Sequence, residues 1–201
     1  MFRQSAQALA CAALLGVTVA DAAGGSIIIA RSVGEVSYPA SRYGWEDAQT
    51  SRFLLGYDLA DLPVSFEFAM MESGTSTYDY FAVCGCEVSI DGPEIRKFSA
   101  LQLAAGYRLW THRRTGTGLV LRGGLYDADS TIDPITTSKE SFSNRGYFLG
   151  VAGTLMVLPA FGVRVEWEYF DGLEDIERHD ASLTWAGLIL KFGGYPPFFS
   201  Q

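Results

Sequence analysis

The sequence is poor in cysteine, in positive charge and in long apolar runs. Three of the 201 residues are cysteine, so at most one disulfide can form within the chain. Lys and Arg number 15 against 23 Asp and Glu, a net charge of −8 with no basic stripe, which excludes nucleic acid as a partner. No run reaches the about 18 apolar residues that a spanning helix needs. Only a closed barrel of strands could therefore carry the processed chain across a membrane.

What the sequence has in abundance is glycine and aromatic residues. It contains 22 Gly, and 13% of its residues are aromatic, whereas only 19% are charged. This composition favours a β protein whose strands pack closely. The length fits one domain with a substantial core.

The N-terminus has the features of a signal peptide. Arg3 supplies a positive charge, residues 6–20 are mostly Ala, Leu and Val, and Ala20 and Ala22 are the small residues that signal peptidase requires. We therefore predict that residues 1–22 are removed on export. Residues 23–192 would then form the folded domain, and residues 193–201 a short C-terminal tail.

Eight patterned segments follow, most of them of the length that a tilted strand needs to cross a bilayer. They lie near residues 26–36, 50–58, 62–71, 98–109, 117–127, 146–157, 161–171 and 181–192. Short connections (59–61, 111–116 and 158–160) alternate with long ones. This alternation predicts an all-β fold, an eight-stranded antiparallel up-and-down transmembrane β-barrel with both termini at the periplasmic end.

The parity of these segments indicates which face meets lipid. In the seventh segment Val163, Val165 and Trp167 alternate with Arg164, Glu166 and Glu168, and other segments likewise have one large apolar face. The interior of eight strands is only wide enough to be filled by side chains, so it cannot hold all the large apolar groups. We therefore predict that the apolar face points into lipid.

Two hairpins resemble those of the OmpA-like and OmpX-like family of eight-stranded outer membrane barrels. Residues 51–58 followed by 64–68 resemble the family's second hairpin, and residues 163–171 followed by 183–192 its closing hairpin. Within the last segment, Gly187, Leu190 and Phe192 resemble the insertion signal recognised by the barrel-assembly machinery. The resemblance implies a place in the outer membrane of a Gram-negative bacterium, with membrane lipids and lipopolysaccharide as partners.

Several charged residues are predicted to point into the barrel: Arg31, Glu35, Glu67, Arg108, Arg122, Arg164, Glu166, Glu168 and Lys191. They could line a polar pore, or they could form ion pairs that hold the strands together. We favour ion pairs, because an unpaired buried charge is costly. The centre of this network is expected to consist of Glu67, Arg122, Arg164, Glu166 and Glu168.

Catalysis has little support in the sequence. His112 lies in a predicted periplasmic turn. His179 has Asp175, Asp180 and Ser182 near it in sequence, but a triad is defined by geometry and not by proximity along the chain. We expect a non-enzymatic protein without cofactor or metal, and a lipid-modifying enzyme is the less favoured alternative.

Cys84 and Cys86 lie in the longest predicted loop, on the oxidising side of the membrane. A loop disulfide is the first interpretation, followed by free or intermolecular thiols and then a soft metal. The expected role of the whole chain is structural, or contact with a surface ligand that the sequence does not identify. We expect a monomer whose lumen is plugged by ion pairs, with a narrow porin-like channel as the alternative.

Overall fold

The computed structural model describes residues 25–37, 48–59, 62–74, 76–78, 94–112, 116–133, 140–173 and 180–193. The predicted signal peptide, the cysteine pair, His179 and the predicted tail beyond Gly193 lie outside these residues.

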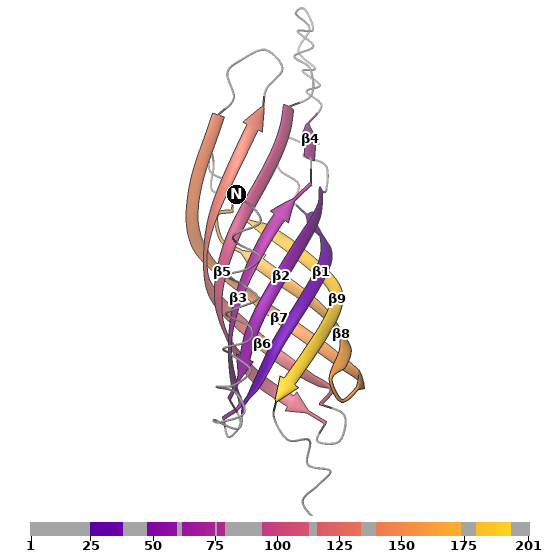
Figure 1. Ribbon diagram of the computed structural model, residues 1–201. Helices are drawn as coiled ribbons and strands as arrows, with labels where there is room; N and C mark the ends of the chain where they lie inside the picture. The colour runs from indigo at the N-terminus through magenta and orange to yellow at the C-terminus, as the bar shows by residue number, and fades with distance from the viewer. Residues whose placement is uncertain are drawn as a thin grey trace, which may run out of the picture.

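The described residues form one antiparallel sheet that closes into a barrel (Figure 1). Its strands are β1 (Ser26–Ser37), β2 (Ala48–Asp58), β3 (Val64–Ser73), β4 (Ser76–Tyr78), β5 (Glu94–Thr111), β6 (Gly118–Asp133), β7 (Glu140–Leu158), β8 (Phe161–Phe170) and β9 (Ala181–Gly193). The short β4 pairs with β5 beyond the end of β3, so the barrel wall has eight strands. The predicted fold class is confirmed. The described part of the chain contains no helix long and apolar enough to span a membrane.

The first and last strands close the barrel, as the sequence predicted. Ser26 of β1 pairs with Gly193 of β9, and the register continues without interruption to Ser37. The series of paired residues that starts at Arg31 and runs through β2, β3, β5 and β6 ends at Arg145 of β7. The series that starts at Arg31 and runs the other way, through β9 and β8, ends at Leu155 of β7. These two positions lie ten residues apart on the same strand. A stagger of this kind requires strands that are steeply tilted, as Figure 1 shows.

Three strands are longer than the sequence predicted. β5, β6 and β7 have 18, 16 and 19 residues and project beyond their neighbours at one end (Figure 1). Their outward positions become polar there, at Asp127, Asp129 and Ser143, although pairing continues to Ile132 and Glu140. The predicted boundaries were too short because they followed the apolar face, whereas hydrogen bonding does not depend on it. We call this end the projecting end, and the opposite end the short-turn end.

The two faces of the wall differ as predicted. Large apolar side chains point outward and are exposed; they include Phe66, Leu103, Leu125, Leu149, Leu155, Val165, Trp167 and Leu188. The interior holds two apolar clusters. The one toward the projecting end includes Phe148, Phe170, Leu183 and Trp185. The other, toward the short-turn end, consists of Ile28, Ala30, Leu54, Ala69, Met156 and Ile189.

Arg31 and Glu35 were predicted to lie inside the barrel, and this prediction was wrong. Both side chains are exposed, while Ser32 between them is buried. Residues directly paired across a sheet share one face, and Arg31 pairs with the outward Leu188. The strand begins with three isoleucines in a row, so its apolar residues do not alternate and its parity could not be determined from sequence.

Candidate functional site

Six charged side chains meet in the middle of the barrel interior, and we call them the charged cluster. Its arginines are Arg52, Arg122 and Arg164, and its glutamates are Glu67, Glu166 and Glu168. Each residue is at most 4% exposed. Three positive charges therefore face three negative charges, and the cluster is formally neutral.

Glu166 of β8 contacts all three arginines. Its Oε2 accepts hydrogen bonds from Nη1 of Arg122 at 2.5 Å and from Nη2 of Arg164 at 3.1 Å. Its Oε1 accepts one from Nη2 of Arg52. Such a carboxylate is held by charge-assisted hydrogen bonds from three strands, and its loss would leave an excess of positive charge in the interior.

Glu168, two residues further along β8, gathers a second set of donors. Nη1 of Arg52 donates to Oε1 at 2.7 Å, and Arg122 donates to the same oxygen. Gln102 and the indole nitrogen of Trp185 donate to Oε2 at 3.1 and 3.2 Å. Both oxygens are thus satisfied within the barrel, as a buried carboxylate requires.

Glu67 of β3 completes the cluster from the other side of the barrel. Arg164 donates to both of its oxygens, at 3.0 and 3.1 Å, and Nη2 of Arg122 lies 2.6 Å from Oε2. All five residues that the sequence placed at the centre of an internal network therefore lie together.

Sequence reasoning missed Arg52. The alternation of Arg52, Leu54, Gly56 and Asp58 with outward apolar residues was the available signal, since all four are buried. Its guanidinium lies over the ring of Trp185, with 4.6 Å from the central carbon to the ring centroid. This cation–π contact and the two glutamates fix Arg52 in one place.

Glycine makes room for the cluster on neighbouring strands. Arg122 is paired with Gly106 of β5 and Gly150 of β7. A Cβ on Gly150 would lie 2.6 Å from the carbonyl oxygen of Trp167 and 2.8 Å from Cγ of Glu168. The charged side chains therefore occupy space that the side chain of any residue other than glycine would need at position 150.

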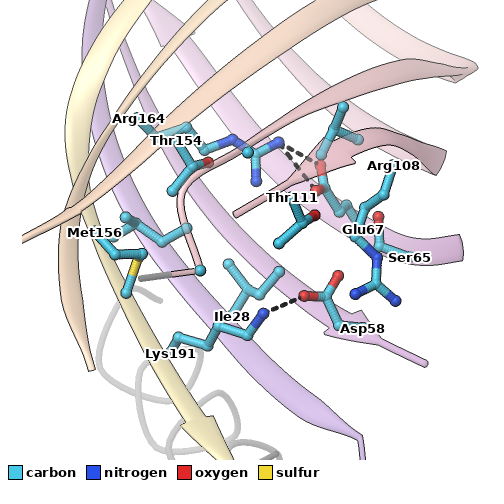
Figure 2. Close-up of a pocket in the computed structure, with 14 residues that line it drawn as sticks. Ile28, Asp58, Ser65, Glu67, Arg108, Thr111, Thr154, Met156, Arg164 and Lys191 are labelled. Carbon is cyan, nitrogen blue, oxygen red and sulfur yellow. Dashed lines mark hydrogen bonds and ion pairs between the residues drawn. The ribbon is translucent and has the colours of Figure 1, made fainter. Parts of the chain in front are cut away.

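A hollow lies between the charged cluster and the short-turn end (Figure 2). Among its lining residues, Lys191 contacts Asp58 at 2.6 Å, and Arg164 reaches Glu67 from the cluster side. Arg108 donates to the carbonyl of Leu59 at 2.7 Å. Two further charges predicted inside the barrel, Arg108 and Lys191, thus lie at its short-turn end and outside the cluster.

The remaining candidate residues that the structure describes do not join this site. His112 lies at the β5–β6 turn with its ring 6.4 Å from that of Trp110, and the cysteine pair and His179 are outside the described residues. Leu190 and Phe192 of the predicted insertion signal point outward, and Gly187 pairs with Ser32. The described residues contain no group of His, Cys, Asp and Glu that could hold a metal ion.

No protein-family model and no curated protein sequence matches the chain. Solved structures do. Ail, the attachment invasion locus protein of Yersinia pestis, was solved in complex with the heparin analogue sucrose octasulfate; it is 13% identical over 84% of this chain and 97% of its own, with a TM-score of 0.54. Neisserial surface protein A is 17% identical over the same shares, with a TM-score of 0.53. A major outer membrane protein from Thermus thermophilus is 11% identical over 84% and 99%, with a TM-score of 0.58.

At these identities the likeness shows the fold alone. The chain has the fold of eight-stranded outer membrane barrels, as its resemblance to OmpA-like and OmpX-like proteins indicated. Together with the outward apolar belt, this fold supports a location in the outer membrane.

Proposed function

We propose that this protein is a non-enzymatic outer membrane barrel with a closed lumen and a structural or surface-interaction role. The observation that carries this proposal is the buried, charge-balanced cluster in the middle of the interior. Outer membrane lipids and lipopolysaccharide surround the apolar belt, and the barrel-assembly machinery inserts the chain.

Buried apolar side chains lie on both sides of the cluster. Toward the projecting end, the ring of Phe170 lies 5.3 Å from those of Tyr126 and Phe148. Toward the short-turn end, Leu54 and Ile189 are buried. Because eight strands enclose a space that side chains can fill, this packing supports a closed lumen over the narrow channel.

Conductance in planar bilayers tests the closed lumen. We expect the folded protein to produce no regular current steps. Regular steps whose ion selectivity changes in Glu168→Gln would show that ions pass the charged cluster, and would replace the proposal with the narrow channel. Asp127→Asn, which alters an outward charge, is the matched control.

The surface role is supported by the projecting strands. β5, β6 and β7 continue their pairing beyond the apolar belt with polar outward residues, among them Ser99, Asp129 and Ser143. This part of the sheet, beyond the apolar belt, is accessible to other molecules. The net charge of −8 makes a polyanion such as the heparin analogue bound by Ail an unsuitable ligand. We expect the folded protein to pass through a heparin column at low salt.

An enzyme assay tests the remaining alternative, a lipid-modifying enzyme. We expect no hydrolysis or acyl transfer when the folded protein is incubated with phospholipid or lipid A. Activity that disappears in His179→Ala but persists in His112→Ala would instead show a lipid-modifying enzyme.

A further inference from the structure

One charged side chain lies within the outward apolar belt. Arg31 is an outward residue of β1, between Ile29 on one side and Val33 and Glu35 on the other. Its paired neighbours are Phe53 of β2 and Leu188 of β9, both outward and apolar. In a membrane the guanidinium of Arg31 would therefore emerge among lipid chains.

Arg31 has no partner within the described part of the protein. No ion pair or hydrogen bond joins its side chain to a described residue, in contrast to the three arginines of the charged cluster. A charge on the lipid face of a barrel is costly near the bilayer centre, and such residues pair with another polar group. An acidic group from outside the barrel would supply a partner for Arg31.

Beyond Arg31, toward Glu35, the outward surface has small and polar residues. Val33 is 66% exposed, and its paired neighbours are the small residues Ser51 and Ala186. Glu35, the next outward residue, pairs with the polar Gln49 and Thr184. Small and polar residues allow two proteins to approach closely within a membrane. These residues lie on the β2–β1–β9 face, which is turned toward the viewer in Figure 1.

This face is complementary to itself. Arg31 and Glu35 are four residues apart on one strand, a distance of about 13 Å at the usual rise per residue. If the strand is tilted by about 40° from the membrane normal, Glu35 lies about 10 Å above Arg31, measured along that normal. Two copies in one membrane share their orientation, so their two-fold axis is parallel to the membrane normal. If that axis passes beside Val33, the two β1 strands lean in opposite directions. Each Arg31 then lies directly below Glu35 of the other copy.

We propose that the β2–β1–β9 face binds a second copy of this chain, with Arg31 of each barrel paired to Glu35 of the other. A long arginine side chain can extend upward through the apolar layer and meet the shorter glutamate. The dimer forms two symmetric ion pairs around a contact between the two Val33 side chains. This dimer is an alternative to the monomer that the sequence predicted, and the proposal rests on the barrel lying in a membrane.

A disulfide across the axis is the direct test. In a Cys84→Ser/Cys86→Ser background, Val33→Cys should give a cross-linked dimer on mild oxidation in native membranes, and Leu121→Cys should not. Leu121 is an exposed belt residue on β6, far from β1 around the wall. Absence of the Val33→Cys dimer, or equal cross-linking of Leu121→Cys, would overturn the proposal.

Charge reversal tests the ion pairs. Arg31→Glu places four glutamates at the contact and Glu35→Arg four arginines, so each variant alone should lose about tenfold or more of the cross-linked dimer. The double variant Arg31→Glu/Glu35→Arg should restore it. Cells that express both single variants with different tags should give mixed dimers, because each glutamate then meets an arginine. Heat-modifiable gel mobility checks that every variant still forms a barrel.

The charge-reversal series also distinguishes the other source of negative charge, the phosphate of an outer-leaflet lipid. If lipid phosphate is the partner of Arg31, Arg31→Glu should reduce co-purified lipopolysaccharide, Glu35→Arg should not, and the two variants should not complement each other. That result would overturn the dimer.

Discussion

Arg52 and Trp185 meet across the barrel interior although β1 separates their strands. The guanidinium lies over the indole ring, and the indole nitrogen in turn donates to Glu168, which also binds Arg52. Trp185 is fully buried. Trp167, on the neighbouring strand β8, points outward and is 48% exposed.

The two tryptophans should therefore respond differently to their surroundings. In single-tryptophan variants, with Phe at the other three positions, brominated lipids should quench the fluorescence of Trp167 strongly and that of Trp185 little. A quencher in the bilayer reaches only side chains that point into lipid. Comparable quenching of both residues would show that the interior and exterior faces of β8 and β9 are wrongly assigned.

Glu166→Gln should destabilise the barrel. The change leaves three buried arginines with two glutamates, and breaking a buried ion network in this way costs about 3–5 kcal/mol. Urea unfolding in lipid vesicles, followed by gel mobility, measures the loss. Asp127→Asn is the control, because the Asp127–Arg145 pair is 47% and 80% exposed at its side chains, and should cost less than about 1 kcal/mol. Equal effects of the two changes would contradict a structural role for the charged cluster.

Gly150→Ala should also destabilise the barrel, by about 1–3 kcal/mol, because the added methyl group collides with the backbone of Trp167 and the side chain of Glu168. Gly153 lies on the same strand with the opposite parity. A Cβ there would have the carbonyl oxygen of Val165 as its nearest neighbour at 3.9 Å, so Gly153→Ala should be tolerated. The same unfolding assay compares the two, and a neutral Gly150→Ala would mean that the cluster has spare room.

The ion pair between Lys191 and Asp58 should behave differently from the cluster. Its side chains are 27% and 10% exposed, so salt reaches it. Lys191→Gln should cost about 1 kcal/mol or less at low salt, and the difference from wild type should shrink as salt is raised. The cost of Glu166→Gln should change little over the same range. A salt-independent effect of Lys191→Gln would place that pair in the closed interior.

The sequence was most informative where each strand has a clear parity. In β8, strict alternation identified Arg164, Glu166 and Glu168 as inward residues, and the structure brings them together. In β1, three consecutive isoleucines hid the parity, and only pairing with the strands on either side determines that Arg31 points outward.

Two further features depend on contacts between distant strands. Arg52 was overlooked because its acidic partners, Glu166 and Glu168, lie more than a hundred residues away in sequence. The extra length of β5, β6 and β7 has no apolar pattern and rests on backbone hydrogen bonds between them. Local patterns specify the faces of strands that alternate clearly, but the partners across the barrel come only from the closed fold.

The charged cluster has a consequence for the timing of assembly. Arg52 and Glu166 are 114 residues apart, and the other members come from β3, β6 and β8, so the cluster cannot form before most of the wall is in place. Contacts of such long sequence separation slow folding, because the entropy of closing the chain is lost before they form. Until closure, six charges need water. Insertion must therefore proceed around a hydrated interior, and expulsion of that water should be among the last events of folding.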